Sequence, residues 1–165
     1  MQVFPPIGAI LCGVLQRHRP LPYLRRVREP WRILVQVPGA RLKRFVLSTL
    51  GGRNAHQQSQ QGIPGNDWLA GITDPPCVSD PEFFARWLTR IPGQVVELTC
   101  HPGYLDTTLI GRDCTATDGQ LQRRVRELHL LRQPSFEDAC RQAGFTLASP
   151  AELRKLQAEG RAEAA

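Results

Sequence analysis

The stretch Gln94-Val95-Val96-Glu97-Leu98-Thr99-Cys100-His101-Pro102-Gly103-Tyr104 decides how the rest of the chain is interpreted. Its β-branched and apolar residues predict a buried strand over 94–100. Pro102 cannot donate to a sheet ladder, and Gly103 permits backbone angles closed to other residues, so the strand must stop at His101. A histidine then opens the loop at the carboxyl end of a strand. In parallel α/β folds, ligands bind at that end.

Composition places the chain among ordinary globular proteins. Its 165 residues give room for one domain with a core, and 41% are hydrophobic. The net charge is +6, but no basic stripe with interleaved aromatic residues is present, so we expect no nucleic-acid partner. An arginine-rich surface could instead suit an anionic membrane face, and we expect possible peripheral contact with it.

The cysteines and the apolar segments predict a cytoplasmic protein. Five cysteines at wide, irregular spacing, with no CxxC pair, favour reduced thiols over a disulfide framework or a zinc knuckle. The apolar run over 7–15 is too short to span a bilayer and lacks the flanks of a signal peptide. We therefore expect a cytoplasmic location, with possible association with the inner membrane surface.

Helices alternate with short apolar strands along the chain. Periodicity and end signals predict helices from Pro5 to about His18, over 42–50 with Gly51-Gly52 as the stop, from Asp80, over about 118–131, over 135–143, and after a capping box at Ser149 to Glu152. Strands are predicted at 23–27, 94–100 and 145–148, and a long polar connection at 52–67. This alternation indicates a parallel α/β fold.

The predicted strands are few for a free-standing parallel sheet, and Met1 to Phe4 looks like the end of a strand that enters a helix. We therefore expect the C-terminal portion of a larger α/β domain. The predicted domain part covers 1–157, and residues 158–165 are predicted to be a flexible tail.

Several segments together resemble the YdjC-like carbohydrate deacetylases. They are Val96 to Tyr104 with its HPGY turn, Arg124 to Leu128, Leu131 to Pro134, and Ala143 to Ser149. Gly65 to Gly71 and the segment around Cys77 resemble more narrowly the hopanoid-associated branch called HpnK. The resemblance runs along nearly the whole chain.

The resemblance implies a parallel-stranded (β/α) barrel-like fold and a metal-dependent hydrolase that removes the acetyl group from N-acetylated amino sugars. In the HpnK branch the expected substrate is an N-acetylglucosaminyl hopanoid lipid, and the expected cofactor is a divalent metal, Mg or Zn. The family's metal site uses an early Asp-Asp turn and histidines that do not occur here. We therefore expect only the C-terminal part of the fold, without its N-terminal strands and without metal ligands.

His101 is the candidate catalytic residue. A histidine can donate or accept a proton near neutral pH, and amide hydrolysis needs a proton on the leaving amine. By analogy with metal-dependent deacetylases, the resemblance implies that His101 supplies it. The alternative is a histidine that only caps its turn by hydrogen bonding.

Six further residues are candidates for substrate binding. Arg25 and Arg28 flank a predicted strand end, where a guanidinium could bind sugar hydroxyls, or could be solvated surface charge. Asn66, Asp67 and Trp68 could form a substrate lip, with the indole stacked on a sugar face, although Trp68 could equally anchor the core. Tyr104 could line the sugar pocket or serve ordinary turn chemistry.

Two neighbours of His101 were weighed as well. Glu97 lies inside the strand, where a carboxylate needs a partner, and it could orient His101 or form a structural salt bridge. Cys100 cannot easily form a dyad with His101, because adjacent strand residues point to opposite faces. The other histidines have no second ligand at metal spacing, so no metal ligand is predicted.

Three functions compete at this point. The first is a deacetylase acting on an amino-sugar hopanoid. The second is a catalytically inactive, truncated remnant, or a binding partner of hopanoid-biosynthesis proteins. The third is a basic nucleic-acid module, for which salt-sensitive binding to DNA or RNA would be the sign.

Overall fold

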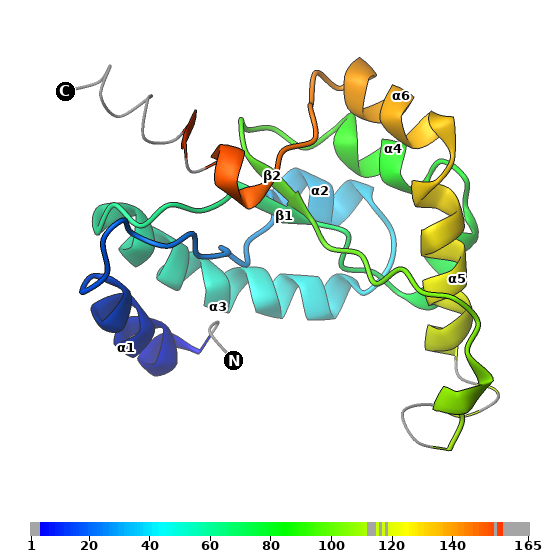
Figure 1. Cartoon of the computed structure of the whole chain (residues 1–165), viewed down its shortest axis with the longest axis horizontal. Helices are drawn as coiled ribbons and strands as arrows, with labels where there is room; N and C mark the ends of the chain where they lie inside the picture. The colour runs from blue at the N-terminus through cyan, green and yellow to red at the C-terminus, as the bar shows by residue number, and fades with distance from the viewer. Residues whose placement is uncertain (1–3, 112–114, 116, 118, 154, 157–165) are drawn as a thin grey trace.

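The computed structural model describes residues 4–111, 115, 117, 119–153 and 155–156. Its elements, in chain order, are α1 (Pro5–Leu15), α2 (Trp31–Gln36), α3 (Arg41–Gln60), β1 (Trp68–Ala70), a 3-10 helix (Pro75–Ser79), α4 (Phe83–Leu88), β2 (Val96–Leu98), a 3-10 turn (Thr107–Leu109), α5 (Gly119–Leu131) and α6 (Pro134–Gln142). In Figure 1, α1 and α3 lie together on one side of the strands, and α4, α5 and α6 on the other. The predicted tail at 158–165 lies outside the described residues.

The two strands form a parallel pair at the centre of the molecule. Trp68 pairs with Val96 and Ala70 with Leu98. Beyond the strand end, the Thr99 N–H donates to the Ala70 carbonyl over 2.8 Å. The mixed helices and small parallel sheet confirm the α/β class.

The segment 24–28 runs beside β1 in the same direction but forms no regular strand. The Leu24 N–H donates to the Pro64 carbonyl, and the Leu69 N–H donates to the Arg28 carbonyl, each over 2.8 Å. The predicted strand at 23–27 is therefore wrong as a strand. Side-chain bonds replace part of the backbone ladder, since the Arg26 N–H donates to the Asn66 amide oxygen over 2.7 Å.

The helix α3 runs through the two glycines that were predicted to stop it. Gly51 is buried, and a Cβ built on it would lie 1.8 Å from the Val27 carbonyl oxygen. The glycine is thus the point at which the helix backbone approaches the 24–28 segment, a use of glycine that a local pattern cannot separate from a helix stop. Since α3 continues to Gln60, the predicted connection at 52–67 is mostly helix.

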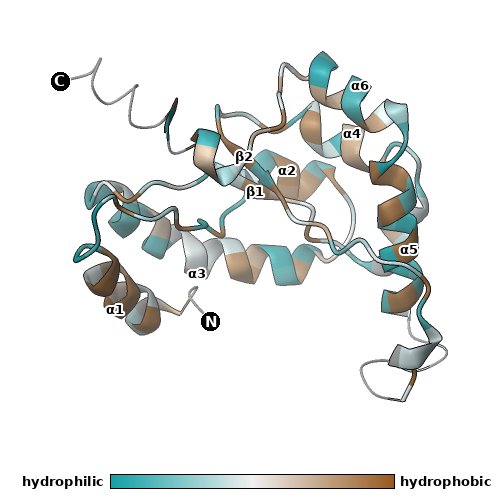
Figure 2. Cartoon of the chain, viewed as in Figure 1, coloured by the Kyte–Doolittle hydropathy of each residue, from teal (hydrophilic) through white to brown (hydrophobic). Residues whose placement is uncertain are grey.

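Aromatic side chains of α4 fill the main core. Phe83, Phe84 and Trp87 are buried there, and the ring of Phe84 meets that of Phe136 from α6 edge to face at 5.2 Å. Figure 2 shows the apolar colour concentrated on α4 and along α1. The core therefore lies between the sheet and the helices α4 to α6.

A buried arginine joins α3 to the segments before it. The Arg44 guanidinium donates to both carboxylate oxygens of Glu29 (2.8 and 2.6 Å) and to the Val37 carbonyl (2.6 Å). It also lies 4.6 Å from the centre of the Trp87 ring. Burial raises the pKa of the Glu29 carboxyl, and the Arg44 charge opposes this rise. The pair is fully bonded, as a buried ion pair must be.

The C-terminal part matches its predicted helices better than its predicted strand. Helices α5 and α6 lie where the periodicity predicted them. The capping box is confirmed, because the Ser149 N–H donates to the Glu152 carboxylate over 2.6 Å and the Glu152 N–H to the Ser149 hydroxyl over 3.3 Å. Residues 145–148 form no strand, so that prediction is wrong. Among the described residues, no helix combines the length and the apolar character needed to cross a bilayer.

Candidate functional site

The carboxyl ends of β1 and β2 meet at a tight backbone contact. Gly71 follows β1 with φ of +90°, and a Cβ built on it would lie 2.2 Å from the Thr99 carbonyl oxygen. Only glycine allows this approach without a shift of the backbone. The contact fixes the point from which the chain continues through Cys100 to His101.

His101 stands on an open depression at this end of the strands. Five neighbours line it: Pro102, Gly103, Tyr104, Asp106 and Arg124. The depression has a volume of about 330 Å³, and the His101 side chain is exposed. No hydrogen bond to its imidazole is found within the part of the chain that the structure describes, so both ring nitrogens are open to a ligand.

The backbone of the His101 turn is held from below by α5. The His101 N–H donates to the Glu127 carboxylate, and the Gly103 N–H donates to the Arg124 carbonyl over 3.1 Å. Glu127 is 1% exposed, and the Arg123 Nε donates to its other oxygen over 2.7 Å. The turn is thus fixed while its imidazole stays free.

Cys100, next to His101, faces inward and is half-buried. Burial raises the pKa of its thiol, and the Glu127 charge raises it further. The thiol is therefore neutral near neutral pH, which disfavours a cysteine nucleophile.

Tyr104 lies on the same depression as His101, as the substrate-binding hypothesis requires. Its side chain is 68% exposed, and its hydroxyl accepts a hydrogen bond from Arg132 Nη2 over 2.7 Å. The Arg132 guanidinium also lies over the Tyr104 ring, 5.4 Å from its centre, so only the part of the ring that Arg132 leaves exposed could contact a sugar beside His101.

Asn66 and Asp67 lie at the opposite, amino-terminal end of the strands. The Asn66 amide accepts from the Arg26 N–H (2.7 Å) and donates to the Arg26 carbonyl (2.9 Å), and the residue is fully buried. The Asp67 carboxylate accepts the N–H groups of Gln94 (2.9 Å) and Val95 (3.0 Å). Both side chains join neighbouring segments through hydrogen bonds to the backbone.

Arg28 and Trp68 pair with each other. The Arg28 guanidinium lies 4.6 Å from the centre of the Trp68 ring, and its Nε donates to the Asp67 carbonyl over 2.8 Å. The predicted lip residues Asn66, Asp67 and Trp68 therefore contact neighbouring segments of the fold. They lie at the amino end of the strands, whereas His101 lies at the carboxyl end.

Arg25 pairs with Glu97, as one of the two interpretations of Glu97 predicted. The Arg25 guanidinium contacts the Glu97 carboxylate, and the Tyr23 hydroxyl donates to the same carboxylate over 3.1 Å. Burial, together with the charge and hydrogen bond of Glu97, raises the pKa of the Tyr23 phenol far above its ordinary value. The phenol therefore stays protonated, and the Glu97 carboxylate forms a structural ion pair with Arg25.

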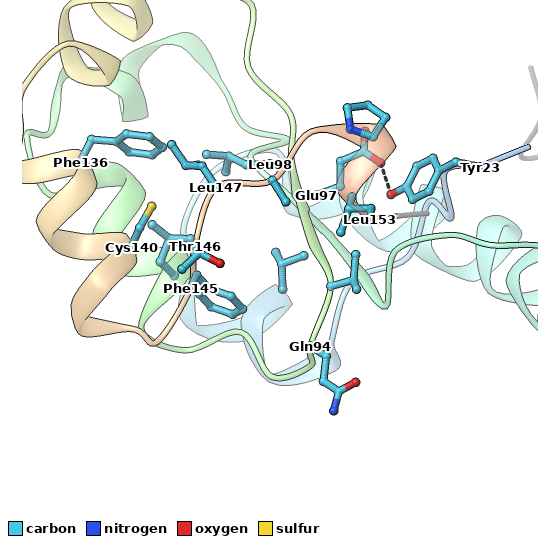
Figure 3. A pocket seen from close by; sticks show the side chains of 15 residues that line it. Tyr23, Gln94, Glu97, Leu98, Phe136, Cys140, Phe145, Thr146, Leu147 and Leu153 are labelled. Carbon is cyan, nitrogen blue, oxygen red and sulfur yellow. Dashed lines mark hydrogen bonds between the residues drawn. The ribbon is translucent and has the colours of Figure 1, made fainter. Parts of the chain in front are cut away.

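A second, apolar cavity of about 340 Å³ runs along β2. Residues of β2, α6 and the segment 145–153 line it, and the hydrogen-bonded pair of Tyr23 and Glu97 closes one end (Figure 3). Phe136 and Cys140 of α6 lie toward the other end. The cavity suits an apolar group.

The ligand set of a metal ion is not found here. Among the residues that the structure describes, no three or more His, Cys, Asp or Glu side chains gather in a way that could hold a metal ion. The described residues therefore do not fit the divalent metal that the family implies.

The fold and the site define an α/β protein that presents a free histidine at the carboxyl end of a parallel strand pair. The family model described as YdjC-like protein matches residues 1–142. The chain therefore belongs to the YdjC-like family, whose members are carbohydrate deacetylases and are generally metal-dependent. No curated protein and no solved structure matches the chain.

Two functional candidates were missed by the sequence argument, Arg123 and Glu127. Their signal was present, because they stand four residues apart on a helix, where opposite charges pair. The pair was missed because attention to the apolar residues of α5 left the charged residues beside them to the solvent side, whereas both are buried.

Proposed function

We propose that this chain takes part in removing the acetyl group from an N-acetylated amino sugar, with His101 as the proton donor to the leaving amine. The observation that carries the proposal is the exposed imidazole of His101, to which no described residue forms a hydrogen bond, in a chain of a carbohydrate deacetylase family. In this reaction water adds to the amide carbonyl, the C–N bond breaks, and the nitrogen takes up a proton. Imidazolium is suited to deliver that proton near neutral pH.

The surroundings of His101 fit a sugar in contact with solvent. Tyr104 offers an aromatic face, and Arg124 and Asp106 offer charged groups on the same depression. Aromatic stacking and charged hydrogen-bonding groups are the usual means of holding a polar ring. The depression is open, which suits the end of a larger glycoside better than an enclosed small molecule.

A hopanoid carrying N-acetylglucosamine is the proposed substrate. Its sugar would lie at His101, while the apolar cavity along β2 offers a place for a hydrophobic group. The proposal includes a divalent metal, Mg or Zn, as cofactor. Its ligands are not found as a cluster among the described residues, so no step is derived through it.

The test is acetate release from an N-acetylglucosaminyl lipid and from N-acetylglucosamine oligomers, each with added Mg²⁺, with added Zn²⁺ and with chelator. We expect activity in the wild type and a roughly 10²- to 10⁴-fold loss of kcat in His101→Ala, the usual contribution of a general acid. His56→Ala is the matched control, because His56 is exposed on α3 and does not line the depression, so the variant should keep its activity. Acetate release that His101→Ala leaves unchanged would refute the role of His101, and no release under any condition would favour the inactive alternative.

We also propose peripheral contact with an anionic membrane surface. Residues 1–60 hold ten arginine and lysine residues and a single acidic residue, Glu29. The same part exposes large apolar side chains, among them Ile10 (69%), Trp31 (74%) and Leu42 (78%). Basic and apolar groups together suit the headgroup region of an anionic bilayer.

Vesicle sedimentation tests this contact. We expect binding to vesicles containing anionic lipid, weak binding to neutral vesicles, and a loss of binding in Leu42→Ser with Phe45→Ser. Leu156→Ser is the matched control, because Leu156 is 60% exposed but lies far along the chain from the basic part and does not line the cavity along β2. Equal binding to neutral vesicles would refute the electrostatic part, and salt-sensitive binding to DNA instead would favour the nucleic-acid alternative.

A further inference from the structure

Glu127 is a buried carboxylate that joins helix α5 to the backbone of the His101 turn. It is 1% exposed on α5, and one of its oxygens accepts the backbone N–H of His101. A carboxylate this deep is costly unless it is paired and hydrogen-bonded. Its position is therefore specific: it holds the backbone of the residue that carries the free imidazole.

Arg123 supplies the pairing charge and extends the contact to the other strand. Its Nε donates to the second oxygen of Glu127 over 2.7 Å, and its Nη1 donates to the Thr73 carbonyl over 3.1 Å. Thr73 lies three residues beyond β1, and His101 three residues beyond β2. The pair thus connects the carboxyl ends of both strands through one helix.

We propose that Glu127, held by Arg123, is a positioning residue for His101, which fixes the backbone of the histidine turn against both strand ends. The inference rests on the proposed function for its catalytic meaning, but its geometric content can be tested without activity.

Cys100 gives a local reporter of the Glu127 charge. Burial raises the pKa of the Cys100 thiol most, the Glu127 charge adds to the rise, and the Arg123 charge opposes it. Removal of the negative charge should therefore lower the pKa of this thiol and speed its alkylation. Cys140, which is buried on α6, should not respond.

Three variants separate positioning from stability. Glu127→Ala removes the acceptor, and Glu127→Gln keeps an acceptor without the charge. In the double variant Arg123→Met/Glu127→Met, apolar side chains of similar size replace the pair, which often keeps stability. Asp138→Asn is the matched control, because Asp138 forms an exposed ion pair with Arg141 on α6.

The first readout is amide hydrogen exchange of His101, with the Thr99 amide as internal reference because it donates to Ala70 in the ladder. We expect exchange of His101 relative to Thr99 to rise roughly 10- to 100-fold in Glu127→Ala and in the double variant, and by less in Glu127→Gln, since a hydrogen bond to a charged group is the strongest of these. Mass spectrometry of alkylated peptides should show faster labelling of Cys100 in Glu127→Gln. Asp138→Asn should change neither.

The second readout is the deacetylase assay. Glu127→Ala should lower kcat about tenfold or more. KM should stay nearly unchanged, because the exposed groups that contact the sugar remain. Glu127→Gln should restore part of kcat, because it keeps a hydrogen-bond acceptor. If the wild type releases no acetate, the proposed function fails, yet the exchange measurement still decides the positioning role. Protection of the His101 amide that persists in a folded double variant would overturn the inference.

Discussion

The two ends of the same short strand pair differ in how their polar side chains are used. At the amino end, Asn66, Asp67 and Arg28 all bond to backbone groups of neighbouring segments. At the carboxyl end, the backbone of His101 is held by Glu127, whereas its imidazole is exposed. A side chain whose polar atoms already form hydrogen bonds with the protein contributes to stability. An exposed side chain on a fixed backbone can instead contact a ligand. The difference separates the residues whose side chains hold the fold together from the histidine for which we propose a catalytic role, although all looked alike in the sequence.

The largest effect on stability is expected for Asn66→Ala. The change leaves the Arg26 N–H and carbonyl without their partner in a buried place. We expect the free energy of unfolding to fall by about 2–4 kcal/mol, since each unmet buried polar group costs about 1–3 kcal/mol. Denaturant titration measures it. Asn66→Asp keeps the acceptor but loses the donor, so its free energy of unfolding should lie between those of the wild type and Asn66→Ala. An Asn66→Ala protein as stable as the wild type would remove the distinction between the two ends of the strand pair.

A smaller loss is expected for Arg28→Ala. The variant loses the bond to the Asp67 carbonyl and the cation–π contact with Trp68. Together these should cost about 1–2 kcal/mol of unfolding free energy. Arg32→Ala on the exposed face of α2 is the control and should cost less than about 0.5 kcal/mol. Equal effects of the two changes would mean that Arg28 is surface charge only.

His101→Ala should change the free energy of unfolding by less than about 0.5 kcal/mol, because the side chain is exposed and the N–H bond to Glu127 belongs to the backbone. Thermal and denaturant unfolding of the variant measure this. The same change is expected to abolish most of the acetate release, so His101→Ala should separate the effect on activity from the effect on stability. A loss beyond about 1 kcal/mol would place His101 with the structural residues of the amino end.

The smallest effect concerns Asp106, which lines the depression with His101. Hydrogen bonds from the Thr108 hydroxyl and N–H lower the pKa of its carboxyl. The pKa of Asp106 is lower in the folded protein than in the unfolded chain. The stabilisation of the fold by the ionised Asp106 is therefore complete above the unfolded pKa and is lost as the pH falls through the folded pKa. The Thr108 amide resonance should therefore shift at a pH below the ordinary range of an aspartate. Asp106→Asn should abolish this titration, and a midpoint at the ordinary value would contradict the bond.

Much of the secondary structure could be predicted because its signals are local. Proline starts, the Ser149 capping box and the apolar stripes place α1, α5 and α6 within a few residues of their observed ends. The predictions failed where a contact distant in sequence decides. Gly51 looked like a helix stop, but it marks the approach of α3 to Val27. Trp68, the first residue of β1, was assigned with Asn66 and Asp67 to a substrate lip, because a strand of three residues has no periodicity of its own.

The candidate site could be predicted in the same partial way. The order of residues in 94–104 placed His101 at the carboxyl end of a strand, and the structure agrees. The substrate residues split, because only the pairing of β1 with β2 shows that Asn66, Asp67 and Trp68 lie at the other end. Whether these residues contact a substrate in solution stays a prediction.

By itself, the sequence determined the α/β class, the helices α1, α5 and α6, and the turn that presents His101, because each depends on residues adjacent along the chain. It did not predict α2, and it ended α3 too early. The tertiary structure decided which polar groups are occupied. Arg28 and Asn66 are bonded at one end, and Glu127 reaches the His101 backbone from 26 residues further along the chain. Such pairings depend on how helices dock on the strands, which spacing within a segment does not specify.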